Sequence, residues 1–105
     1  MGQSVIQALK KCEEVSGIVA HDIREACVRE ARERFQVEAT TDLGRILNDP
    51  AVQLVFVTSS TDAHKRLTIQ ALEAGKAVMC EKPMATTLAD AREMLDVAER
   101  RGGFL

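Results

Sequence analysis

The sequence predicts an α/β fold, a doubly wound parallel sheet with helices on both faces. Short apolar runs alternate with stretches of helical period along almost the whole chain. The runs are apolar at successive positions, which is typical of strands buried between two layers of helices. At 105 residues, 46% of them hydrophobic and 29% charged, the chain has room for one domain with one core.

The first half of the chain should contain three helices and two short strands. Helical periodicity predicts helices over residues 3–14, 24–35 and 43–47, and apolar runs predict strands over 17–22 and 37–39. Thr41 and Asp42 should begin the third helix, and Asn48-Asp49-Pro50 should end it.

The second half should continue the alternation with better-defined boundaries. Residues 52–57 form the clearest strand, residues 62–74 a helix, and residues 77–80 another buried strand. Gly75 is expected to cap the end of that helix. Thr87, with Asp90 three residues later, is a start signal for the last helix, which Gly102-Gly103 should end. Phe104-Leu105 would open one more strand.

Composition argues against several classes of function. A net charge of −2 with interspersed signs gives no attraction for nucleic acid or an anionic membrane, and three Phe without Tyr or Trp make a base-stacking surface improbable. The three widely spaced cysteines indicate buried thiols in a reducing cytosol, with neither disulfides nor a metal site. Without a membrane-spanning stretch or a signal-peptide pattern, a cytoplasmic protein is expected.

Three polar clusters follow predicted strands, where open parallel sheets bind their ligands. The first is Asp22, at the position where a Rossmann fold places an acid against the adenosine ribose hydroxyls. Such a carboxylate would repel the extra phosphate of NADP and so favours NAD. Capping of the following helix explains Asp22 equally well, and both interpretations stay open.

The second cluster is the hydroxyl-rich turn Thr58-Ser59-Ser60-Thr61, which runs into a helix N-terminus. Backbone amides and hydroxyls there suit a phosphate or a nicotinamide edge. Simple N-capping by Thr61 is the alternative. His64, in the first helical turn, could reach the cofactor edge, although a surface histidine is the commoner meaning of such a residue.

The third cluster, Glu81-Lys82-Pro83, is the most informative. The proline keeps Lys82 out of helical geometry, so strand and helix meet in a rigid corner that holds an anion and a cation at the sheet edge. Lys82 could steer a substrate oxygen or the nicotinamide, with Glu81 fixing its position or contacting the cofactor. A cis Lys82–Pro83 bond is one of two geometries open to the corner. A solvated ion pair at a turn is the alternative.

Taken together, these segments resemble a known family over essentially the whole chain. The sequence is similar to the N-terminal NAD(P)-binding domain of the glucose–fructose oxidoreductase/inositol dehydrogenase (Gfo/Idh/MocA) family. The matching segments are Gly17–Asp22, Ala39–Asp42, Asp49–Val52, Thr58–His64, Ala71–Lys76 and Glu81–Ala85.

The resemblance implies a hydride-transferring oxidoreductase that uses NAD(P) on a sugar, cyclitol or related polyol, and Asp22 favours NAD over NADP. It implies a substrate-binding and catalytic role for Lys82. It also implies cofactor contacts at Asp22, Ile23, Thr58, Ser59, Ser60, His64, Glu81 and Lys82. A complete enzyme of this kind is expected to be a homo-oligomer.

Two departures from the family pattern shape these expectations. The family usually carries Thr-Pro where this chain has Ser59-Ser60, which predicts a less rigid loop. The first strand with its Gly-rich turn and the C-terminal substrate domain are also missing, so residues 1–105 are expected to be a partial Rossmann domain. Since that turn cradles the cofactor phosphates, the chain alone should bind NAD weakly or not at all and be inactive.

Two other interpretations were weighed. A response-regulator receiver domain also places Thr/Ser and Lys-Pro at strand ends, with Asp22 as phosphoacceptor, but the acidic pair that binds magnesium is lacking. A truncated, non-catalytic paralogue would carry the same residues without an activity of its own.

Overall fold

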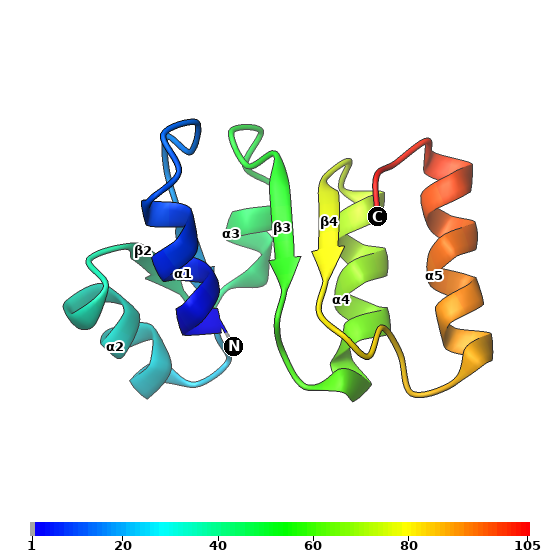
Figure 1. Ribbon diagram of the computed structural model, residues 1–105, viewed down its shortest axis with the longest axis horizontal. Coiled ribbons are helices and arrows are strands. Elements are labelled where there is room, and N and C mark those ends of the chain that lie inside the picture. Colours follow the sequence, from blue (N-terminus) through cyan, green and yellow to red (C-terminus); the bar gives the residue numbers. More distant parts are fainter. Residues whose placement is uncertain (1) are drawn as a thin grey trace. The chain divides into compact units, whose positions relative to one another are not determined.

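The computed structural model describes residues 2–105, which form two compact units divided between Asn48 and Asp49. Each unit consists of helices and a pair of parallel strands (Figure 1). The α/β class predicted from the sequence is confirmed, and the two units are described separately below. None of the helices among residues 2–105 is long and apolar enough to cross a membrane.

The first unit pairs two three-residue strands and packs a helix on them. Its elements are α1 (Gly2–Lys10), β1 (Val19–His21), α2 (Glu25–Arg34), β2 (Glu38–Thr40) and α3 (Leu43–Leu47). The strands are parallel, with Val19 opposite Glu38 and His21 opposite Thr40. Val28 and Ala31 of α2 pack with Ala39 of β2, and this apolar cluster fixes α2 against the strands.

The second unit holds the better-packed core. It comprises β3 (Leu54–Val57), α4 (Thr61–Glu73), β4 (Ala77–Cys80) and α5 (Leu88–Arg101). The strands β3 and β4 are parallel, and the two helices pack against each other beside them (Figure 1). The fully buried apolar side chains come from every one of these elements: Val57, Ala71, Leu72, Val78, Met94, Val97 and Ala98.

Helix boundaries in the second unit follow the capping signals of the sequence. The backbone N–H of Asp90 donates to Thr87 Oγ1 at 3.0 Å, which caps the N-terminus of α5. Gly75 and Gly102 follow α4 and α5 with φ of +83° and +62°, a left-handed conformation that glycine adopts without steric cost. These three residues were predicted as helix signals, and that prediction is confirmed.

The first helix is shorter than predicted, because α1 ends at Lys10 and residues 11–14 form turns. Cys12 and Glu14 are exposed, so no packing supports the additional helical turn. The prediction of buried cysteines is also wrong. Cys12 is exposed and Cys27 and Cys80 are half-buried, although all three are free thiols as expected.

Strand pairing agrees with the order that a Rossmann sheet predicts. In the order 3-2-1-4-5-6, β1 and β2 take positions 2 and 3, and β3 and β4 take positions 4 and 5. Each pair is therefore a pair of neighbours in that order. The N–H of Val78 in β4 donates to the carbonyl of Phe104 at 2.9 Å, as expected if residues 104–105 begin another strand beside β4.

Candidate cofactor site

In the second unit, the two polar clusters that follow β3 and β4 lie side by side. The strands β3 and β4 are parallel and paired as far as Val57 opposite Cys80, so the segments that follow them leave the sheet at the same edge. The N–H of Glu81 donates to the carbonyl of Val57 at 3.0 Å, which extends the pairing into the corner. The structure thus brings Thr58, Ser59 and Ser60 close to Glu81 and Lys82, as the strand-end argument predicts.

The turn after β3 keeps its hydroxyl groups available. Ser60, not Thr61, is the N-cap residue of α4, and its side chain makes no capping hydrogen bond. The alternative that Thr61 caps the helix is therefore wrong. Ser59 and Ser60 are both exposed, and the Ser59 hydroxyl makes only a long contact of 3.5 Å to the carbonyl of Ser60. Together with the backbone N–H groups of the first turn of α4, these hydroxyls form a surface suited to a polar or anionic group.

The corner after β4 presents the lysine to solvent. The Lys82–Pro83 peptide bond is cis, and Lys82 is exposed. Over residues 2–105, no salt bridge joins Lys82 to Glu81 or to any other acid, so the ion pair of the alternative interpretation is not formed. The Glu81 carboxylate instead accepts a long hydrogen bond of 3.4 Å from the backbone N–H of Lys82. The ammonium group is thus available to a ligand at this edge of the sheet.

His64 is buried, with 2% of its surface exposed. Its ring lies between two backbone carbonyls, with Nδ1 2.9 Å from the oxygen of Pro83 and Nε2 3.0 Å from the oxygen of Ser59. The alternative of a surface histidine is therefore wrong. The cofactor contact predicted for His64 stays a prediction, since both ring nitrogens face the protein's own backbone.

In the first unit, Asp22 follows β1 and is engaged by Arg24. Its carboxylate accepts the backbone N–H of Arg24 at 2.9 Å, and two bonds from the guanidinium, Nε at 3.1 Å and Nη2 at 3.2 Å. The Arg24 guanidinium lowers the pKa of Asp22, because its hydrogen bonds favour the charged carboxylate. Arg24 is itself the N-cap residue of α2, so the interpretation of Asp22 as the helix cap is wrong.

Arg24 is the functional candidate that sequence reasoning missed. Its side chain is 71% exposed and that of Asp22 31% exposed, so the pair lies at the surface and not in the core. An arginine two residues after the acid at the predicted ribose position was the available signal, because an arginine near that position accommodates the 2′-phosphate of NADP. Ile23, between them, is 83% exposed and leaves its backbone and side chain open to a ligand.

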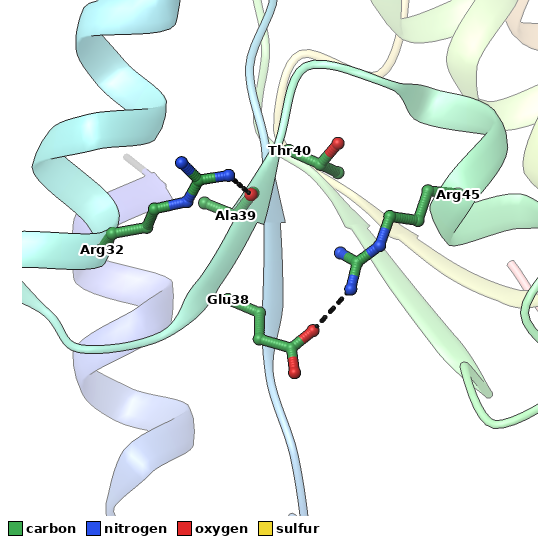
Figure 2. Close-up of a pocket in the computed structure, with 5 residues that line it drawn as sticks. All are labelled: Arg32, Glu38, Ala39, Thr40 and Arg45. Carbon is green, nitrogen blue, oxygen red and sulfur yellow. Dashed lines mark hydrogen bonds and ion pairs between the residues drawn. The ribbon is translucent and has the colours of Figure 1, made fainter.

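A shallow pocket of about 260 Å³ in the first unit lies elsewhere, at β2 (Figure 2). Arg32 and Arg45 line it, but both guanidinium groups have partners. Arg32 donates to the carbonyl of Ala39 at 2.8 Å, and Arg45 pairs with Glu38 at 2.9 Å. Because these interactions already use the positive charges, the pocket supplies no evidence for an anion site.

Comparison with protein families identifies the chain. Residues 1–105 match the Gfo/Idh/MocA family, described as an oxidoreductase family with an NAD-binding Rossmann fold. The chain belongs to this family. It therefore does not belong to the receiver domains weighed as an alternative. The chain spans only about a fifth to a third of the length of the curated relatives it matches.

Individual relatives are dehydrogenases and reductases. The chain is 40% identical over 80 residues to the myo-inositol 2-dehydrogenase of Thermotoga maritima, covering 75% of this chain and 24% of that protein. It is also similar to the WlbA dehydrogenase of Chromobacterium violaceum, solved with NADH and UDP-GlcNAcA (TM-score 0.88, 30% identity, 97% of this chain and 30% of that one). The 3-ketoreductase KijD10 of Actinomadura kijaniata, solved with NADP and a TDP compound, has a TM-score of 0.85 at 28% identity, with 95% and 31% covered.

Proposed function

We propose that this chain is the nicotinamide-dinucleotide-binding part of an oxidoreductase that acts on a sugar, a cyclitol or a related polyol. Membership of a family with an NAD-binding Rossmann fold supports the cofactor. The inositol dehydrogenase and the sugar-nucleotide enzyme among the similar proteins support the substrate class. The carrying observation is that the Ser59-Ser60 turn and the Glu81-Lys82 corner lie side by side, with their hydroxyl and ammonium groups exposed.

In this proposal the cofactor supplies the chemistry of hydride transfer, and the protein binds and orients it. Ser59, Ser60 and the backbone N–H groups at the start of α4 would hold polar or charged parts of the dinucleotide. Thr58 and Glu81, at the ends of the paired strands, would contact the nicotinamide end. Lys82 would bind a substrate oxygen and stabilise charge that develops there during the reaction.

In the first unit, Asp22 would accept hydrogen bonds from the ribose of the adenosine, with Ile23 beside it. A free carboxylate at this position repels a 2′-phosphate, which favours NAD over NADP. The guanidinium of Arg24 reduces that repulsion, because it is already bound to both carboxylate oxygens. The Asp22 carboxylate supports NAD as the proposed cofactor, and Arg24 is the residue that would set how strictly NADP is excluded.

A titration of the ¹⁵N-labelled chain with NADH, followed by amide chemical shifts, tests this proposal. We expect dose-dependent shifts at Ile23, Ser59, Ser60 and Lys82, with a dissociation constant on the order of 1 mM or weaker. Lys82→Met should reduce the shifts at the corner and leave those at Ile23 in place. Shifts confined to other surfaces would contradict cofactor binding by these residues. Micromolar affinity would contradict the expectation that the chain alone binds weakly.

A further inference from the structure

The buried ring of His64 connects two segments that belong to different strand ends. It lies in the first turn of α4, five residues after Ser59 and nineteen before Pro83, and contacts the backbone carbonyl of each. These are the same two segments, the turn after β3 and the corner after β4, that carry the exposed hydroxyl and ammonium groups of the candidate site. The imidazole is thus the bridge between them.

The arrangement is specific because each ring nitrogen faces a different oxygen. Nδ1 is 2.9 Å from Pro83 O and Nε2 is 3.0 Å from Ser59 O, both within ordinary hydrogen-bond distance. A neutral imidazole donates through one nitrogen only, whereas the imidazolium donates through both. Burial at 2% exposure removes water as a competing partner, so each carbonyl depends on the ring for its hydrogen bond on this side.

We propose that His64 is a positioning residue that holds the Ser59-Ser60 turn and the Glu81-Lys82-Pro83 corner at a fixed separation. It does so through its two ring contacts, Nδ1 to the carbonyl of Pro83 and Nε2 to the carbonyl of Ser59, and a ring nitrogen that carries a proton donates to the oxygen it faces. In this role the side chain touches neither cofactor nor substrate. It fixes the two backbone segments from which the exposed groups project. The link to Lys82 chemistry rests on the proposed function, but the connection of the two loops does not.

Backbone carbonyl shifts of the chain, measured without any cofactor, test this inference. The amides of Ser60 and Met84 report the carbonyl carbons of Ser59 and Pro83 in a three-dimensional amide–carbonyl correlation experiment. Loss of a hydrogen bond moves a carbonyl carbon upfield. We expect His64→Phe, which keeps an aromatic ring without nitrogen donors, to move upfield each carbonyl carbon that accepts a hydrogen bond from the ring.

Two conservative variants separate the two hydrogen bonds. The side-chain nitrogen of asparagine can take the place of Nδ1, and that of glutamine the place of Nε2. His64→Asn can therefore restore only the Pro83 shift, and His64→Gln only the Ser59 shift. His21→Phe, which removes the chain's other histidine from β1, is the matched control and should move neither. A merely space-filling role for His64 would give no such division between the two variants.

Unchanged Ser59 and Pro83 carbons in a folded His64→Phe chain would overturn the inference. So would equal, scattered changes in the asparagine and glutamine variants. If His64→Phe does not fold, the wild-type chain still tests the inference. A ring that bridges the two carbonyls must show a slowly exchanging N–H proton on His64. Failure of the NADH titration with normal carbonyl shifts would count against the proposed function and leave the bridge intact.

Discussion

Thr68 and Thr87 should respond to the same substitution with opposite changes in stability. Thr68, in α4, is completely buried, and its hydroxyl has no hydrogen-bond partner within the described part of the chain. Thr87 caps α5 by accepting the N–H of Asp90. Replacing either by valine keeps the branched shape and removes the hydroxyl, so the difference between the two sites isolates what each hydroxyl contributes.

The magnitudes follow from the environment of each hydroxyl group. A buried polar group without a partner costs about 1–3 kcal/mol. Burial raises the pKa of the Cys80 thiol, and the Thr68 hydroxyl lowers that pKa by a smaller amount. The hydroxyl therefore interacts weakly with the sulfur, and this interaction offsets part of the cost of burying Thr68. Sulfur is a weak acceptor, so we expect Thr68→Val to stabilise the chain by about 1 kcal/mol. Loss of the cap in Thr87→Val should destabilise it by about 1 kcal/mol.

Urea unfolding followed by far-ultraviolet circular dichroism measures both changes, and amide exchange at Leu72 reports the second unit directly. A stability change of about 1 kcal/mol corresponds to a shift of about 4–8 °C in the midpoint of thermal unfolding for a chain of this size. The dependence of the unfolding free energy on urea concentration should stay constant. If Thr68→Val destabilised the chain as much as Thr87→Val, the Thr68 hydroxyl would have a strong partner and the reasoning would be refuted.

Three further outcomes are expected from the same structure. Thr68→Val should raise the pKa of the Cys80 thiol further, so the rate of thiol alkylation should rise at a higher pH than in the wild type; an unchanged profile would mean that the hydroxyl does not act on the sulfur. Arg24→Gln should raise the pKa of Asp22 toward its ordinary value of 3.8, as measured by carboxyl-carbon titration. Because folding lowers the pKa of Asp22, the stability that this carboxylate contributes is fully present above its ordinary value of 3.8 and is lost as the pH falls through the folded pKa. An Arg24→Gln chain that unfolds in acid with the same pH dependence as the wild type would contradict this pairing. Gly102→Ala should destabilise α5 by about 1 kcal/mol, because φ of +62° is strained for alanine, and unaltered urea unfolding would count against that left-handed cap.

Much of the fold could be predicted because local signals act within a few residues. The strand Ala77–Cys80 and the helix Leu43–Leu47 were predicted with the bounds that the structure has. The last helix was predicted to within one residue, since Thr87 and Gly102 cap its two ends. Residues 11–14 were wrongly assigned to the first helix, because their pattern is amphipathic but no other element covers the face it creates.

The residues of the candidate site could be predicted from the sequence, but the groups that they contact could not. Position after a strand is a property of the sequence, so Asp22, the Ser59-Ser60 turn and the Glu81-Lys82 corner could be chosen from spacing and family resemblance. The partners of these groups depend on side chains that fold back onto them. The ion pair between Arg24 and Asp22 was therefore found only in the structure. The interpretations of Asp22 and of Thr61 as helix caps were wrong for the same reason.

The sequence by itself determined the alternation of helices and strands, the parallel class of the sheet and the family to which the chain belongs. Those follow from periodicity, capping residues and short motifs, all of which are local along the chain. Tertiary structure alone decided the register of the paired strands, with Val19 opposite Glu38 and Leu54 opposite Ala77. It alone showed that His64 is buried between the carbonyls of Ser59 and Pro83 and is not a surface residue. The physical reason is that a hydrogen bond between residues far apart in sequence depends on how the strands are packed, and no local pattern encodes that distance.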